Sequence, residues 1–176
     1  MDSDAPDTKI DPPARRSGRW RRLWFYGSLL LLSILAIYLF RGMPPPARAA
    51  MRNADSFELL SLNPEHRRKD AAFHGFAVLG RATVSDQAAR RRLYNALQSG
   101  ARWGTLPASC FDPRHGIHMV SNGKTIDLLI CFHCGQAQVW QDDRLVTYFT
   151  ISGSPEPVFD QALRDAGLPV APKSLE

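Results

Sequence analysis

The chain has 176 residues, a formal net charge of +5, 44% hydrophobic residues and only three cysteines. This length allows one domain of ordinary size together with a smaller segment. Part of the positive charge lies in arginines that flank an apolar run near the N-terminus, and no nucleic-acid-binding motif follows. The composition therefore excludes a nucleic-acid footprint, and we expect no nucleic-acid partner.

The N-terminal part changes abruptly in composition. Residues 1–22 are mainly polar residues, Pro, Ala and Arg, which cannot bury enough apolar surface to fold and predict a disordered terminus. Residues 23–40 carry no charge, and a helix of this length rises roughly 27 Å at ~1.5 Å per residue, close to the hydrocarbon thickness of a bilayer. Trp20, Trp24 and Tyr38 lie where interfacial aromatic residues anchor a membrane helix. The pattern predicts a transmembrane helix over residues 23–40.

Basic residues predict the orientation of this segment. More arginines precede it than follow it, and the richer side stays in the cytoplasm. We therefore expect a cell-membrane protein with a cytoplasmic N-terminus and an extracytoplasmic C-terminal part. The alternative is export with cleavage near Ala49, because Ala47-Arg48-Ala49 fits the small-x-small pattern of a cleavage site. The preceding arginines are Arg15, Arg16, Arg19, Arg21 and Arg22, and the following ones are Arg41, Arg48 and Arg52.

The region after the apolar run divides into a spacer, a domain and a tail. Three consecutive prolines predict an extended, Pro-rich spacer over residues 41–54 that holds the domain away from the membrane. Residues 55–170 contain the periodic patterns of an α+β domain. The remaining residues, 171–176, are expected to form a tail.

Periodicity at the start of the domain predicts two strands followed by a helix. Residues 56–62 read as a short strand, and the alternation over residues 73–84 is typical of a half-buried strand. Ser85 then caps a helix over residues 86–99, which Gly100 ends.

Two chain reversals predict the second half of the domain. Asn122-Gly123 lies between two alternating runs and is a strong signal for a two-residue hairpin. A further reversal at Asp142-Asp143 leads into a last strand, and a final helix begins after Ser154. The predicted order is ββαβββα, a largely antiparallel sheet with two helices packed on it, preceded by one transmembrane helix.

The stretch ICFHCG, residues 130–135, raises the question of whether Cys131 and Cys134 can meet. In a regular strand, residues three apart point to opposite faces and lie roughly 10 Å apart. However, small and apolar residues occupy even positions before the cysteines and odd positions after them. A β-bulge between the cysteines, with Gly135 at positive φ, explains the switch and turns both sulfurs to the non-core face. The alternative is a strand covered on both faces, since Leu129 is also apolar.

The two-residue Asn-Gly turn also fixes a register between its strands. It places His118 opposite Asp127 and Arg114 opposite Cys131. The simpler interpretation of the His118–Asp127 pair is a surface ion pair worth ~0.2–1 kcal/mol. The candidate binding residues on the outer face are Arg114, His115, His118 and Asp127.

Three interpretations remain open for the cysteines. Thiols oxidise outside the cytoplasm, which favours a structural disulfide from Cys110 to Cys131 or Cys134. A redox pair of Cys131 and Cys134 is the second interpretation, although redox C-x-x-C motifs usually begin a helix. The third is a zinc site. Its candidate ligands are Cys110, Cys131 and Cys134 together with His115, His118 or His133.

Two stretches, CFDPRHGI at residues 110–117 and DLLICFHC at residues 127–134, form the pattern C-F-x-P-R-H-G-I … L-I-C-F-x-C. With FHGFAVLG at residues 73–80 and PVFD at residues 157–160, the chain resembles an uncharacterised family of small exported or membrane-anchored bacterial proteins with no assigned function. The resemblance covers residues 56–170. It implies that the cysteine-containing strand and the Pro-Arg-His stretch lie together, and it implies no catalytic role.

These features predict a membrane-anchored protein with an extracytoplasmic interaction or ligand-binding domain. Its expected partner is an envelope protein or a small ligand, and we expect no cofactor. The competing hypothesis is a thiol-redox or zinc-dependent activity at Cys110, Cys131 and Cys134. We assign no catalytic residue, because the chain has no nucleophile elbow, no H-E-x-x-H motif and no paired carboxylates in a plausible cleft.

Overall fold

The chain in this computed structural model forms two compact units, residues 1–39 and residues 40–176. The structure describes residues 24–34, 42–67, 72–102 and 110–172.

The first unit contains a helix over residues 24–34, whose large apolar side chains are exposed. Among the described residues, no helix is both long and apolar enough to span a bilayer, so the transmembrane helix of the fold prediction is not found. The disordered terminus predicted for residues 1–22 lies outside the described residues, as does the end of the predicted span, residues 35–40.

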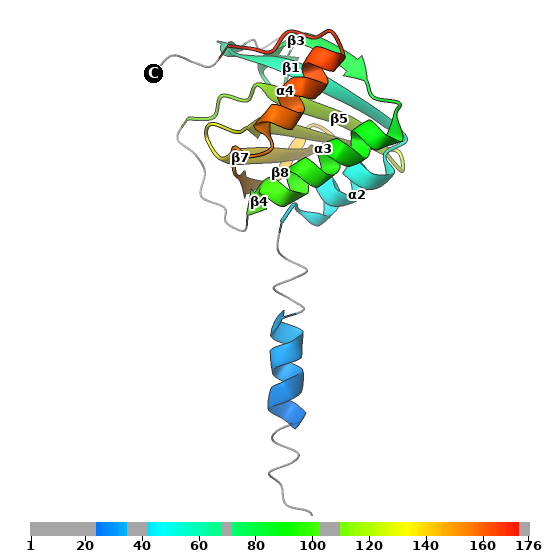
Figure 1. The fold of residues 1–176 in the computed structure, drawn as a ribbon, viewed down its shortest axis with the longest axis vertical. Helices are drawn as coiled ribbons and strands as arrows, with labels where there is room; N and C mark the ends of the chain where they lie inside the picture. Colours follow the sequence, from blue (N-terminus) through cyan, green and yellow to red (C-terminus); the bar gives the residue numbers. More distant parts are fainter. Residues whose placement is uncertain (1–23, 35–41, 68–71, 103–109, 173–176) are drawn as a thin grey trace, which may run out of the picture. The chain divides into compact units, whose positions relative to one another are not determined.

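The second unit is an α+β fold built on one antiparallel sheet (Figure 1). In chain order, its described elements are α2 (Pro45–Asn53), β1 (Ser56–Arg67), β2 (Ala72–Phe73), β3 (Phe76–Thr83), α3 (Gln87–Gly100), β4 (Ala101–Arg102), β5 (His115–Ser121), β6 (Lys124–Cys131), β7 (Gln136–Gln141), β8 (Arg144–Ile151) and α4 (Glu156–Asp165). Within the described residues the sheet has eight strands in the order β2-β3-β1-β5-β6-β7-β8-β4, and neighbouring strands are antiparallel.

The fold prediction was wrong in the number and order of the strands and in the number of helices on the sheet. The predicted strand over residues 73–84 is a hairpin, because His74 and Gly75 form a turn between β2 and β3. The predicted continuous strand through both cysteines is a second hairpin, formed by β6 and β7. In addition, the short strand β4 follows α3 directly and pairs with β8.

Helix α2 replaces the extended spacer that the three prolines predicted for residues 41–54. Proline is tolerated in the first turn of a helix, because its missing N–H has no intrahelical partner there and its fixed φ suits the helix. Ala47, Ala50 and Met51 share one side of α2 and are buried, and the helix contacts β5 and β6. Tertiary burial of this apolar side therefore decides the conformation, as it does for most short helices.

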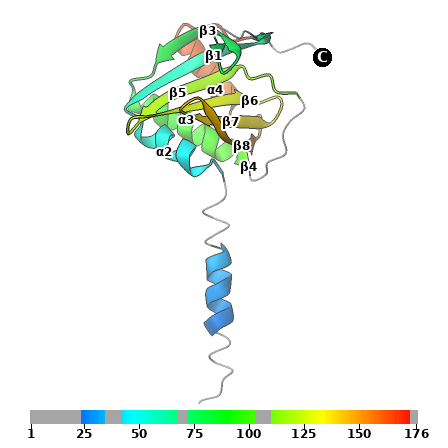
Figure 2. The same cartoon turned by 180° about the vertical axis from the view of Figure 1, so that it is seen from behind.

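Helices α2, α3 and α4 cover one face of the sheet (Figure 1). Ile126, Leu128 and Ile130 of β6 point to this helix-covered face and join the main core. Because side chains alternate along a strand, Asp127 and Leu129 point to the other face. We call it the helix-free face; in Figure 2 the strands lie in front of the helices on this side.

A smaller apolar cluster occupies part of the helix-free face. This second cluster is a small hydrophobic core on the helix-free face, next to the polar residues described below. Its buried members are Leu60, Leu62, Phe76 and Leu129, against which Phe73, Val78, Phe111 and Trp140 pack.

The ends of two helices follow from local hydrogen bonding. Asp86, not the predicted Ser85, caps α3, because its carboxylate accepts from the backbone N–H groups of Ala88 at 2.9 Å and Ala89 at 3.1 Å. Helix α4 ends just before Gly167, whose φ of +69° does not continue a helix, as predicted.

Candidate functional site

Three two-residue turns shape the helix-free face. The turns are His74-Gly75, Asn122-Gly123 and Asp142-Asp143, and every one of these residues has a positive φ between 49° and 92°. This is the geometry of type I′ hairpin turns, whose twist matches that of the flanking strands. The Asn122-Gly123 and Asp142-Asp143 reversals are those that the sequence predicted. The outcome is that one residue each from the first and third turns, His74 and Asp143, reaches the same region of β6.

Asp127, in the middle of β6, is the centre of this region. Asp127 is only 4% exposed, and both of its carboxylate oxygens have hydrogen-bond partners. His118 Nδ1 lies 2.7 Å from Oδ1, and His74 Nε2 lies 2.7 Å from Oδ2. The predicted pairing of His118 with Asp127 across the β5–β6 ladder is confirmed. A buried carboxylate needs such hydrogen bonds, because an unpaired charge is costly to remove from water.

Aromatic side chains surround the two imidazoles. The Trp140 ring stacks on His74, with centroids 4.2 Å apart. Its indole N–H donates to the side-chain oxygen of Gln138 at 3.1 Å, which fixes the ring. Phe73 meets His74 and His118 edge-on at 4.9 and 6.4 Å. These contacts hold the imidazole rings in place.

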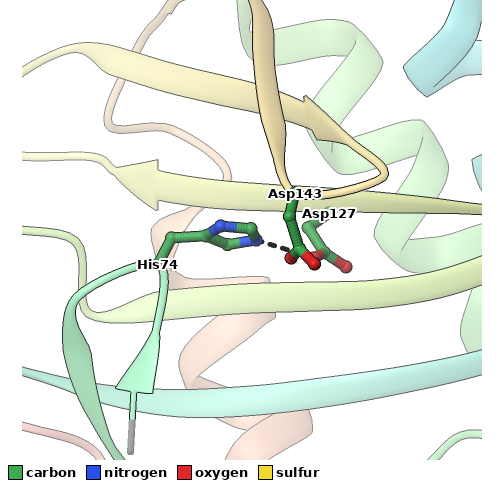
Figure 3. A group of neighbouring side chains, drawn as sticks. All are labelled: His74, Asp127 and Asp143. Atoms are coloured by element: carbon green, nitrogen blue, oxygen red, sulfur yellow. Dashed lines mark hydrogen bonds and ion pairs between the residues drawn. The ribbon is translucent and has the colours of Figure 1, made fainter. Parts of the chain in front are cut away.

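Asp143 brings a second carboxylate to Asp127 from the exposed β7–β8 turn. One ligand atom each of His74, Asp127 and Asp143 lies within 4.8 Å of the others (Figure 3). The turn is attached to the start of β6, because Thr125 N donates to Asp142 Oδ1 at 3.0 Å and Asp142 N donates to Thr125 O at 3.1 Å. We call His74, His118, Asp127 and Asp143 the His–Asp cluster.

Arg114 and His115, predicted to share a surface with His118, lie instead against α4. His115 Nε2 is 2.8 Å from Asp160 Oδ1, and Arg114 Nη2 is 3.3 Å from Glu156 Oε1 and 3.5 Å from Asp160 Oδ1. The hydrogen bond from His115 lowers the pKa of Asp160 most, burial opposes it, and the charges of His115 and Arg114 lower it further. The predicted pairing of Arg114 with Cys131 is not formed, because the ladder of β5 begins at His115. The predicted single surface is therefore two separate sites.

Cys131 and Cys134 form a disulfide, with their Cα atoms 5.2 Å apart. The sulfurs are neighbours as predicted, but the predicted β-bulge within a continuous strand was wrong. Residues 132–135 reverse the chain, and Cys131 pairs with Gln136 across the resulting hairpin. Gly135 has a φ of +66°, which this reversal uses. The switch from even to odd core positions follows from the reversal, which sets Ile130 beside Ala137 on one face.

Cys110 is free and exposed, so the predicted disulfide from Cys110 to either other cysteine is not present. The predicted zinc ligands Cys110, Cys131, Cys134 and His115 are not assembled either. Two of these sulfurs are bonded to each other, and the His115 ring binds Asp160.

Sequence reasoning missed His74, Trp140 and the role of Asp143. His74 was placed inside a strand, where it would have no special position. The available signal was the His-Gly pair between two apolar runs, since histidine is one of the residues enriched at positive φ and glycine adopts it freely.

Comparisons of the chain with family models, with curated proteins and with solved structures gave no match. The family resemblance of the sequence therefore stays a prediction, and the function has to be inferred from the geometry.

Proposed function

We propose that the second unit is a binding domain for a small cationic ligand and that the ligand site is the His–Asp cluster on the helix-free face. One observation carries the proposal. The buried carboxylate of Asp127 and the carboxylate of Asp143 come from separate hairpins, yet they converge on the same imidazole, that of His74.

The charge of the cluster supports a cation as the ligand. Asp127 and Asp143 each carry a negative charge when ionised, and like charges held close together in a partly buried site repel each other. Among the described residues, neither carboxylate forms an ion pair with a Lys or Arg, whereas Arg114 pairs with the acids of α4. A bound cation offsets the repulsion that the protein itself creates.

The disulfide supports a location outside the cytoplasm for this domain. Disulfides persist in oxidising compartments and are rare where thiol reductants are abundant. The Cys131–Cys134 bond closes the turn between β6 and β7 and leaves the His–Asp cluster without a thiol. We therefore propose that the domain binds its ligand in the cell envelope or beyond, and that its cysteines serve its structure.

A cleft between α3 and α4 favours a second candidate function, the binding of an apolar ligand. Its volume is about 630 Å³, within the range of small-molecule sites. Apolar side chains form most of its lining, and they include Val84, Leu93, Val158 and Ala162. This cleft ranks second, because the hydrogen-bonded polar side chains in its lining, Asp86, Gln161 and Asp165, are exposed and bond within their own helices.

Nuclear magnetic resonance of the isotope-labelled full chain tests both candidates. The probes are Zn²⁺, Ca²⁺, Mg²⁺, tetramethylammonium and, as an anionic control, acetate. We expect at least one cation to shift the amide signals of His74, Asp127 and Asp143, and acetate to leave them unchanged. Shifts confined to residues of the cleft, or no shift with any cation, would contradict the proposal.

A further inference from the structure

We propose that the ligand of the His–Asp cluster is a divalent transition-metal ion of the zinc type, held by His74, Asp127 and Asp143. This inference rests on the proposed function and names the ligand of that site. It assigns the metal to a set of residues that shares none of the sulfurs on which a zinc site was expected from the sequence.

The donor set favours this class of cation. It combines one imidazole nitrogen with two carboxylate oxygens. Calcium and magnesium prefer sites built from oxygen alone, whereas imidazole suits zinc, copper, iron and nickel. An organic ammonium ion binds best over the face of an aromatic ring. The Trp140 face that meets the cluster is already covered by the imidazole of His74.

The spacing of the donors also fits a metal ion. Zinc binds nitrogen and oxygen ligands at about 2.0–2.2 Å, so ligand atoms around it are separated by roughly 3–4 Å. His74 Nε2 and Asp127 Oδ2 are now 2.7 Å apart around a shared proton, and the third donor atom lies within 4.8 Å of both. A metal-bound imidazole uses its nitrogen lone pair, so the proton on Nε2 moves to Nδ1 when the ring is neutral and is released to solvent when the ring is an imidazolium. His74 Nε2 and Asp127 Oδ2 then separate by about 0.5 Å to reach this spacing, and the exposed side chain of Asp143 closes around the ion.

The neighbours of the three ligands have the arrangement expected of outer-shell partners. The hydrogen bond between His118 and Oδ1 orients the Asp127 carboxylate. Its other oxygen, Oδ2, faces His74 and is available to bind the metal ion. Trp140 stacks on His74 and holds its ring. His118 is thus a positioning residue, whereas the metal contacts belong to the other three residues.

Three protein ligands leave a coordination position for water or for a further ligand. Structural zinc sites normally have four protein ligands, and sites that exchange a ligand have three. The open position faces solvent, since Asp143 lies in an exposed turn. We therefore expect a metal that binds and leaves reversibly and that is removed by a chelator without unfolding the domain.

Isothermal titration of the chelator-treated full chain with Zn²⁺ tests the inference. The background carries Cys110→Ser, because an exposed thiol binds zinc by itself. The test variants are His74→Asn and Asp143→Asn, since asparagine tolerates the positive φ of both positions. The matched controls are Asp165→Asn, an exposed acid on α4, and His133→Asn, an exposed histidine beside the disulfide.

We expect one Zn²⁺ per chain, at least tenfold weaker binding in both test variants, and unchanged binding in both controls. His118→Gln should weaken binding less than His74→Asn does. Equal Zn²⁺ affinity in all variants, or loss of binding with His133→Asn alone, would overturn the inference.

The outcomes also separate this inference from the proposed function. If Zn²⁺ fails to bind but Ca²⁺ or tetramethylammonium shifts the amides of the cluster, the metal class is wrong and the cation site stands. If no cation binds at the cluster, both are wrong.

Discussion

The two faces of the sheet each hold a histidine against an aspartate, but the surroundings of the two pairs differ. On the helix-covered face, Asp160 binds His115 at 2.8 Å and also has the cation of Arg114 within 3.5 Å. On the helix-free face, Asp127 binds two imidazoles at 2.7 Å, and a second carboxylate, that of Asp143, lies beside it. The first pair has a guanidinium beside its carboxylate and attaches α4, whereas in the part of the chain that the structure describes no Lys or Arg pairs with either carboxylate of the second site.

The contrast between the faces shows that a buried His–Asp pair does not by itself indicate a function. The distance between ring and carboxylate is nearly the same on both faces. What distinguishes the faces is an arginine, which pairs with both acids on one face and has no described counterpart beside the two acids on the other. Six variants, in four experiments, test this comparison.

Asp127→Ala should have the largest effect on folding. It removes a buried carboxylate that serves two imidazoles, and breaking a buried charged pair costs about 3 kcal/mol. Urea unfolding measures the loss. Asp143→Asn is the contrasting variant: it should change metal-free stability by less than about 0.5 kcal/mol, because the residue is exposed. A large loss in Asp143→Asn would show that this acid has a structural role and would remove the contrast between the faces.

Cys134→Ser should lower the free energy of unfolding by about 2 kcal/mol. The disulfide closes a short loop, so it removes less entropy from the unfolded chain than a long loop would. The cluster contains no sulfur, so Zn²⁺ affinity should stay within a factor of two when Cys110→Ser and Cys131→Ser are added, which remove the remaining thiols. A loss of affinity larger than tenfold would connect the disulfide to the ligand site and revive a thiol-dependent function.

Asp160→Asn should cost about 1 kcal/mol at pH 7, because its hydrogen bond to His115 is partly exposed. The hydrogen bond from His115 lowers the folded-state pKa of Asp160. A lowered folded pKa stabilises the protein above the unfolded pKa, about 4, and this contribution disappears as the pH falls through the folded pKa. Urea unfolding of variant and parent should therefore differ at pH 7 and converge near pH 2. An equal difference at both pH values would contradict this origin.

Gly75→Ala and Gly123→Ala form the finest comparison. Both glycines have a positive φ, +92° and +73°, and open space around the added methyl group, so each substitution should cost about 1 kcal/mol. Only the first turn carries His74. Gly75→Ala should therefore weaken Zn²⁺ binding a few-fold, and Gly123→Ala should leave it unchanged. Equal affinities in the two variants would show that the turn geometry does not position His74.

The parts of the fold that follow from local rules could be predicted from the sequence. Asn122-Gly123 and Asp142-Asp143 are turn sequences with a known mechanism, and the first of them placed His118 opposite Asp127. These predictions were right because a two-residue turn fixes the register of its own strands.

The remaining parts depend on contacts between distant segments. His74 and Asp127 are 53 residues apart, and they come from parts of the sheet that β1 and β5 separate, so no local rule brings them together. The reversal at residues 132–135 was mistaken for a bulge, because Phe132 is apolar and a bulge and an even-numbered hairpin loop change the core positions in the same way. The helical state of Pro45–Asn53 depends on burial against strands that come later in the chain.

Anomalous diffraction from a crystal of the protein grown with Zn²⁺ tests the central claim most directly. We expect an anomalous peak at the zinc edge between His74 Nε2 and the carboxylates of Asp127 and Asp143, about 2.0–2.2 Å from each ligand atom. A zinc peak at Cys110 or His133 with no peak at the cluster would contradict it.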